Sequence, residues 1–257
     1  MRIAVMIKQV PDSKLIEIDE NGNLRRDGVP SMVDPFGFFA LKFAVAMKQT
    51  MGCRITVITM GPNQAKEALR RCLEYGADDA ILLSDRSFAG ADTYATAKTL
   101  AQSISDDDYD YVLCGMQATD GDTGQIPAEL SVMLGFHLIS YAADFEFRDG
   151  ELIIDQNYGD SVRKVVAEKG CVISVSRERT GGKQFPSIRD RLEANDKGII
   201  VKDRVALNLG VFSTGMKGSF TKVVRTATPM PVKKNTLRID GSDPEEASRE
   251  ILKEVGL

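Results

Sequence analysis

RITVITMGPNQAKEALRRCLEYGADDAILL, residues 54–83, has the pattern of a strand, a helix and a second strand. The runs Arg54–Met60 and Ala80–Leu83 are short and rich in β-branched and aliphatic residues, which is typical of strands buried on both faces. Between them lies a helical pattern, and Gly76 suits its C-terminal cap. The apolar stripe of this helix consists of Ala65, Ala68, Leu69 and Cys72. This order predicts two parallel strands joined by a right-handed crossover.

The same alternation continues on both sides of this unit. Ile3–Ile7 and Tyr109–Met116 are further runs of the buried-strand type. Asp34 precedes Pro35, a proline that costs nothing at the first helical position, and Asp92 begins another helical pattern as its N-cap. We therefore predict an α/β fold with an open, mostly parallel, Rossmann-like sheet and flanking helices.

Two hairpins are expected to interrupt this alternation. Asn21-Gly22 and Asp149-Gly150 have the residues that tight hairpin turns need, the second within Phe145–Ile154. Both hairpins are predicted to be excursions from the core rather than separate domains. Cys171–Val175 is predicted to be the last core strand.

The chain changes character after this strand. Residues 177–198 are dense in charge and glycine, and residues 210–238 have no helical or strand period. A capped amphipathic helix is predicted from Asp243 to Leu257. We expect an α/β domain over 1–209, followed by an extended arm and C-terminal helix over 210–257. The apolar side of that helix could cover its own core or a partner, and the length of the arm favours a partner.

The composition argues against several classes of function. The chain has 33 Lys+Arg against 37 Asp+Glu, so we expect no general attraction to nucleic acid or an anionic membrane. A single histidine, His137, argues against a His-centred metal site and against a Ser-His-Asp triad. The cysteines form no C-x-x-C pair, which argues against a zinc ribbon or an iron–sulfur site. They are Cys53, Cys72, Cys114 and Cys171.

Targeting signals are not evident. Lys8 interrupts the apolar start of the chain, which is too short for a signal peptide. No later apolar run approaches the roughly 20 residues of a membrane-spanning helix. We expect a cytoplasmic protein without a membrane span.

A glycine-rich acidic loop, Gly115–Gln125, is the strongest candidate for a binding site. It leaves the carboxyl end of a predicted buried strand, where open parallel sheets bind ligands. Its glycines would let backbone N–H groups approach a phosphate, and the helix that follows adds a partial positive charge. Asp120 and Asp122 would repel phosphate, so they would accept from ribose hydroxyls or cap the loop. The alternative is an acidic turn that begins a helix and binds nothing.

Two other strand ends are expected at the same edge. Lys8-Gln9-Val10-Pro11 follows the first strand, and Met60-Gly61-Pro62 follows the second. Three neighbouring ends could therefore line one adenosine-sized crevice, in which Lys8 either meets a phosphate or is simply solvated. The chain has no Walker loop and no G-x-G-x-x-G after the first strand. No nucleophile is paired with a base, so any redox chemistry would come from a cofactor.

Several motifs together resemble the β subunit of electron transfer flavoproteins, including FixA-like members. They occur in that family's order: Ala4-Val5-Met6-Ile7-Lys8-Gln9-Val10-Pro11, Val33-Asp34-Pro35-Phe36, Met60-Gly61-Pro62 and Gln117–Gln125. The segment from Arg177-Glu178-Arg179 through Phe185-Pro186-Ser187-Ile188-Arg189 to Ala194 is similar to the family's signature and recognition loop. The resemblance covers nearly the whole chain.

This resemblance implies a heterodimer with an α subunit that carries FAD, and an adenine nucleotide in this chain. With the strand ends above, the expected nucleotide-binding residues are Met6, Lys8, Asp34, Pro35, Phe36, Gly37, Met60, Gly61, Gln117, Ala118, Thr119, Asp120, Gly121, Asp122, Thr123, Gly124 and Gln125. No catalytic side chain and no metal ligand is expected.

The resemblance also implies a docking loop at 177–198. Phe185, with Pro186 and Ile188, takes the place of the apolar anchor for a partner dehydrogenase of the acyl-CoA, enoyl-CoA or 2-hydroxy-acid type. Family members often follow the anchor with a lysine-rich run, whereas Asn195-Asp196-Lys197-Gly198 is nearly neutral. Docking is therefore expected to differ from the usual mode.

The nucleotide itself is FAD or AMP. The short Asp120–Gln125 loop resembles the FixA-like and anaerobic flavin-bifurcating type, which implies FAD, with NADH as electron donor or acceptor and ferredoxin as a further partner. The alternative is a simple electron carrier with structural AMP. An adenine-nucleotide-binding regulatory module, as in universal stress proteins, is a further alternative, although the glycine-spaced phosphate motif expected for it is not evident.

Overall fold

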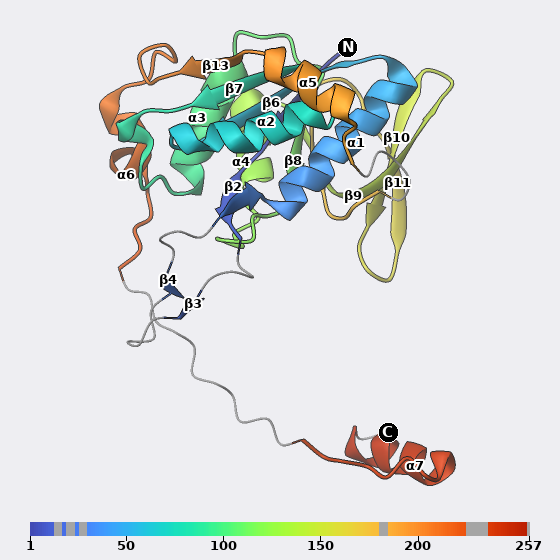
Figure 1. The fold of residues 1–257 in the computed structure, drawn as a ribbon. Helices are drawn as coiled ribbons and strands as arrows, with labels where there is room; N and C mark the ends of the chain where they lie inside the picture. Colours follow the sequence, from blue (N-terminus) through green and yellow to red (C-terminus); the bar gives the residue numbers. More distant parts are fainter. Residues whose placement is uncertain (13–16, 19–23, 26–29, 180–184, 225–235, 256–257) are drawn as a thin grey trace. The chain divides into compact units, whose positions relative to one another are not determined.

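The structure is a computed structural model that describes residues 1–12, 17–18, 24–25, 30–179, 185–224 and 236–255 (Figure 1). The chain divides into two units, Met1–Val224 and Arg225–Leu257. The first unit contains the sheet and the helices that pack on it. In the second unit, the described element is α7 (Pro244–Glu254).

A nine-stranded sheet forms the centre of the first unit (Figure 1). Its order is β11 (Val162–Val166), β10 (Glu151–Asn157), β9 (His137–Arg148), β12 (Cys171–Val175), β8 (Tyr111–Gly115), β1 (Arg2–Met6), β6 (Arg54–Met60), β7 (Asp79–Leu83) and β13 (Ile199–Lys202). All neighbours from β9 to β13 pair in parallel, and β10 and β11 add an antiparallel edge. The predicted α/β fold class is confirmed.

The alternation of side chains along β1 explains the two layers of helices. Ile3 and Val5 belong to an apolar cluster with residues of α1 (Pro35–Met51), α2 (Lys66–Glu74) and α5 (Ile188–Asp196). Ala4 and Met6 belong to a second cluster with residues of α3 (Thr93–Ile104) and α4 (Ile126–Leu134). Successive strand residues point to opposite faces, so a strand that is apolar throughout is covered on both sides.

The predicted helix starts agree with the structure. Asp34 is the N-cap of α1 and Asp92 is the N-cap of α3, and each side chain accepts backbone N–H groups of its helix. A short 3-10 turn, η2 (Asn63–Ala65), follows Pro62 and leads into α2. Gly76, just beyond α2, has φ of +117°, a conformation that glycine adopts without strain.

The hairpin predictions are partly corrected. Asp149 and Gly150 do form the turn between β9 and β10, with φ of +55° and +86°. That hairpin is not an excursion, because β9 pairs with β12 within the main sheet. Near the N-terminus, β3 (Glu17–Ile18) pairs with β4 (Leu24–Arg25), and the Asn21-Gly22 turn lies outside the described residues.

The prediction that Cys171–Val175 is the last strand of the core is wrong. The chain returns after α5 and adds β13 to the far edge, in parallel with β7. The apolar run of β13, Ile199-Ile200-Val201, is only three residues long and lies half-buried or exposed at the edge of the sheet, so it does not stand out as a core strand.

The first unit continues past residue 209 to Val224. Between residues 209 and 224 lie two short turns, η4 (Val211–Ser213) and α6 (Gly215–Gly218). The backbone N–H of Met216 donates to the carbonyl of Ala89 (3.0 Å), beyond η3 (Arg86–Phe88). The carboxylate of Asp92 accepts from the backbone N–H of Thr221 (2.8 Å). Residues 210–224 are thus bound to the loops before α3 by backbone contacts.

Asp92 stabilises this attachment as an anion. Burial alone would raise the pKa of its carboxyl, but hydrogen bonds from Ala95 and Thr221 outweigh the burial and hold the pKa below the usual value.

In the second unit, the predicted capped helix is present, because Asp243 is the N-cap of α7. Ile251 and Leu252 of that helix are exposed, and their packing on a partner stays a prediction. None of the helices in the described part of the chain is suited in length and apolarity to cross a bilayer.

Candidate functional site: a crevice at the carboxyl edge of the sheet

The strand order places a topological switch point at β1. From β1 the chain moves outward to β6 and β7 on one side, and it later fills the other side with β8 and β12. In open α/β sheets, the loops that leave such a point diverge and open a crevice outside the carboxyl ends of the strands. The crevice is therefore expected between Lys8, after β1, and Met116, after β8.

The start of α1 packs against the end of β8, at one side of the expected crevice. A short antiparallel pair, β2 (Gln9–Pro11) and β5 (Ser31–Val33), leads from β1 to α1. A Cβ on Gly115 would lie 2.6 Å from the carbonyl carbon of Phe36 and 2.7 Å from the nitrogen of Gly37. Only glycine at this position lets the helix backbone approach β8 so closely. Pro35, Phe36 and Gly37 are thereby held beside the start of the loop.

Asp34 joins the helix to the loop. Its side chain is almost fully buried, at 1% exposure. One oxygen, Oδ1, accepts from the N–H groups of Phe36 (3.0 Å) and Gly37 (3.4 Å). The other, Oδ2, accepts from both the backbone N–H (2.7 Å) and the hydroxyl (2.8 Å) of Thr119. The N-cap expected from the sequence is therefore also a fastening point for the loop.

Lys8 and Asp120 form an ion pair across the same edge. The Nζ of Lys8 lies 2.6 Å from Oδ1 of Asp120, and both side chains are substantially exposed, at 48% and 36%. The acidic residue that would repel a phosphate is thus engaged by the nearest cation. Met60 ends strand β6 and Gly61 follows it, on the other side of β1 from this loop.

The loop itself is a folded turn. The carbonyl of Ala118 accepts from the N–H groups of Gly121 (3.2 Å) and Asp122 (2.8 Å), and Nε2 of Gln117 donates to Oδ1 of Asp122 (3.1 Å). Asp122 and Gly124 both have positive φ, of +47° and +63°. The turn ends at Gln125, the N-cap of α4.

The start of α4 is open to solvent. Residues 119–125 are exposed, and Gln125 makes no side-chain capping bond to the helix. Backbone N–H groups at an uncapped helix start can bind an anion. Thr123 and Gly124 lie directly before these groups. The arrangement fits the phosphate end of a nucleotide better than it fits a metal ion.

The thiols and the histidine take no part in the crevice. Cys114 lies on β8, and burial raises the pKa of its thiol to about 12. Burial also raises the pKa of Cys53, Cys72 and Cys171. His137 begins β9 beside Cys171 at the start of β12, which is the opposite edge of the sheet.

The predicted docking residues lie elsewhere, at the start of α5. Phe185 is 74% exposed and Ile188 is 80% exposed, whereas Pro186 is buried. Ser187 caps α5 through a capping box with Asp190. Leu192, another of the few apolar residues in the 177–198 segment, is 62% exposed and lies one turn beyond Ile188 on the same side of α5.

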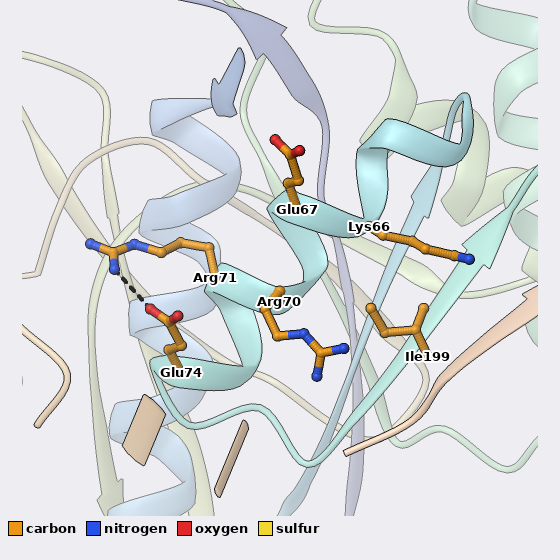
Figure 2. Close-up of a pocket in the computed structure, with 6 residues that line it drawn as sticks. All are labelled: Lys66, Glu67, Arg70, Arg71, Glu74 and Ile199. Atoms are coloured by element: carbon orange, nitrogen blue, oxygen red, sulfur yellow. Dashed lines mark hydrogen bonds and ion pairs between the residues drawn. The ribbon is translucent and has the colours of Figure 1, made fainter. Parts of the chain in front are cut away.

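A hollow of about 340 Å³, away from the expected crevice, lies beside α2 (Figure 2). It is lined by Lys66, Glu67, Arg70, Arg71, Glu74 and Ile199. Its arginines serve the fold, since Arg71 pairs with Glu74 (2.8 Å) and Arg70 donates to the carbonyl of Lys197 (2.9 Å) beyond α5. The hollow shares no residue with the crevice, and we do not assign a ligand to it.

Comparison with known proteins shows the family of this chain. The family model described as "Electron transfer flavoprotein domain" matches residues 22–184, more than half of the chain. The chain is 40% identical to the electron transfer flavoprotein subunit beta of Thermoanaerobacterium thermosaccharolyticum, over 89% of this chain and 88% of that one.

Two further relatives are similar over almost their whole length. Protein FixA of Azotobacter vinelandii is 36% identical, over 98% of this chain and 93% of that protein. The Caffeyl-CoA reductase-Etf complex subunit CarD of Acetobacterium woodii is 34% identical, over 99% and 98%. The chain therefore belongs to the electron transfer flavoprotein family, in the group of its β subunits and FixA proteins.

Proposed function

We propose that this chain is the β subunit of a heterodimeric electron transfer flavoprotein and holds FAD in the crevice between β1 and β8. In this proposal it passes electrons between NADH, the FAD of an α subunit and a partner dehydrogenase, by flavin-based bifurcation. The observation that carries the proposal is the close approach of α1 to Gly115 at the switch point. The start of α1 thereby forms one wall of the crevice, beside the open start of α4.

The residues of the crevice fit a nucleotide cofactor. The exposed start of α4 and the amino group of Lys8 provide donors for phosphate oxygens. The exposed carboxylate of Asp122 suits ribose hydroxyls, which donate hydrogen bonds to such a group. Gly121 has open space where a Cβ would be, so the backbone at that point is accessible.

In this proposal, the residues of this chain bind and orient the FAD. FAD, when bound, supplies the chemistry of taking up two electrons together and passing them on singly. Thr123, Gly124 and Gln125 would hold its phosphates through the backbone. Lys8 would offset their charge by exchanging Asp120 for a phosphate oxygen. Cys114 stays protonated, because burial raises the pKa of its thiol to about 12.

FAD is favoured over AMP by the short Asp120–Gln125 loop. The relative in A. woodii is named for a complex of an Etf with a caffeyl-CoA reductase, which supports a dehydrogenase partner of the enoyl-CoA class. Acyl-CoA and 2-hydroxy-acid dehydrogenases and ferredoxin are further candidate partners. A simple carrier with AMP in the crevice is the second candidate.

A flavin count tests this function directly. The chain is purified with its co-expressed α subunit, the cofactors are released by heating, and FAD and AMP are measured against the heterodimer. We expect two FAD per heterodimer and reduction of the bound flavin by NADH. One FAD with one AMP would overturn bifurcation, and a complex without flavin would overturn the electron-carrier function.

The apolar surface on α5 gives a separate prediction. We expect Phe185→Ala to slow electron delivery to the dehydrogenase by about tenfold or more, because it removes a 74% exposed aromatic anchor of the size typical of binding hot spots. The bound nucleotide should be unchanged. Stopped-flow transfer at several dehydrogenase concentrations measures the effect.

Phe147→Ala serves as the control for that experiment. Phe147 is also exposed, at 42%, but it lies on the β9–β10 hairpin. Transfer should be unchanged in this variant. Loss of nucleotide from Phe185→Ala would mean that the anchor is wrongly placed.

A further inference from the structure

Asp34 uses its whole carboxylate inside the protein. The residue is 1% exposed, and its backbone N–H also donates to the carbonyl of Lys8 (2.8 Å). Its side chain bonds the start of α1 with one oxygen and Thr119 with the other. Three segments that are distant in the sequence therefore meet at one buried anion: the end of β1, the start of α1 and the glycine-rich loop.

The contact with Thr119 differs from the other contact of this loop with the end of β1. Lys8 and Asp120 form an exposed ion pair, and such pairs contribute little because water and salt screen them. The bonds from Thr119 reach a buried carboxylate, and hydrogen bonds to a buried charged group are among the strong ones. The contact of Thr119 with Asp34 therefore fixes the loop more strongly, whereas the contact of Asp120 with Lys8 can be exchanged for another partner.

We propose that Asp34 is a positioning residue that acts through Thr119 to hold the 117–125 loop in the shape that binds the nucleotide. The inference rests on the proposed function of the crevice and adds a role to it. It also revises the expectation that Asp34 touches the nucleotide, since both of its oxygens already accept hydrogen bonds from the chain. Asp34 shapes the site without contacting what the site binds.

The molecule contains a matched control for this role. Asp92 caps α3 with Oδ1, which accepts from the N–H of Ala95 (2.9 Å). Its Oδ2 accepts from the N–H (2.8 Å) and the hydroxyl (3.0 Å) of Thr221. The pattern of hydrogen bonds matches that of Asp34, although Asp92 is half-buried rather than buried. Asp92 joins α3 to residues 219–221, which are not part of the crevice.

Replacing either aspartate with asparagine removes the hydrogen bonds of one carboxylate oxygen and can keep those of the other. Asp34→Asn keeps an oxygen that can cap α1, but its amide nitrogen donates and cannot accept from the N–H of Thr119. The variants are compared as complexes with the α subunit, by titrating the nucleotide-depleted complex with FAD and, separately, with AMP. Thermal unfolding is measured on the same samples.

We expect Asp34→Asn to weaken binding of whichever probe the wild type binds by about tenfold or more, the factor for one hydrogen bond to a charged group. Asp92→Asn should leave binding within about twofold, which is less than one neutral hydrogen bond. Both variants should lower the melting temperature, since each loses hydrogen bonds to a carboxylate, and the loss should be larger for Asp34, which is buried, than for Asp92, which is half-buried. Thr119→Val should weaken binding about fivefold, and Thr119→Ser, which keeps the hydroxyl, should bind as the wild type does.

Unchanged binding by Asp34→Asn, or an equal loss with Asp92→Asn, would overturn the inference while leaving the proposed function intact. If Asp34→Asn does not fold, the comparison of Thr119→Val with Thr119→Ser decides, and equal binding by these two would overturn it. If the wild-type complex binds neither FAD nor AMP, the proposed function and the inference both fail.

Discussion

Replacing Gly115 with alanine is expected to lower the free energy of unfolding by about 1–3 kcal/mol, the usual cost of forcing an extra group into a packed interior. The new Cβ would lie 2.6 Å from the carbonyl carbon of Phe36 and 2.7 Å from the nitrogen of Gly37. These are main-chain atoms, so no side-chain rotation relieves the contact, and α1 must move away from β8. Chemical denaturation followed by circular dichroism measures the loss.

Gly121→Ala is the matched control, because nothing lies within 4 Å of a Cβ at that position. It lies in the same loop and should leave stability nearly unchanged. Gly115→Ala should also weaken nucleotide binding, since α1 forms one wall of the crevice. Equal stability of the two variants would show that α1 does not pack against β8 as closely as described.

Replacing Gly215 with alanine is expected to release residues 210–224 from the core. Gly215 has φ of +54°, and a Cβ would lie 2.0 Å from the carbonyl oxygen of Ser87 and 2.8 Å from that of Ala89. An L-residue in this conformation costs about 1–2 kcal/mol before any clash is counted. Hydrogen exchange at Met216, whose N–H bonds to Ala89, should therefore rise strongly.

Gly210→Ala serves as its control. A Cβ there would meet Ser213 Oγ at 3.7 Å, an ordinary contact, and φ is −73°. Exchange at Met216 should stay as in the wild type. Unchanged exchange in Gly215→Ala would contradict the tight contact between this segment and the loop before α3.

The strand–helix alternation could be predicted because the strands that carry it are apolar on both faces. β13 could not, since only four residues form it and none is fully buried. Its partner β7 lies more than a hundred residues earlier in the sequence, so no local pattern connects the two. Residues 210–224 show no helical or strand period, and close backbone contacts such as those of Gly215 with Ser87 and Ala89 leave no local signal in the sequence.

The site was predictable to the same degree. Asp34 before Pro35 indicates an N-cap, and the glycines of the loop indicate a phosphate-binding turn. The contact made by the second oxygen of Asp34 could not be predicted in this way, because its partner Thr119 lies 85 residues away in the sequence. The pairing of Lys8 with Asp120, 112 residues away, is likewise set by the strand order alone. Both contacts depend on β1 and β8 being neighbours.

The central place of β1 has a consequence for the order of synthesis. β1 is synthesised before both of the strands that flank it, which are β6 on one side and β8, whose last residue is Gly115, on the other. Until then, one edge of an apolar strand stays unpaired, and such edges promote aggregation. Parallel pairing between distant segments is also slow to form. Residues 7–110 must therefore be synthesised before the second edge of β1 can be paired, and we expect chaperones that shield apolar segments to act in that interval.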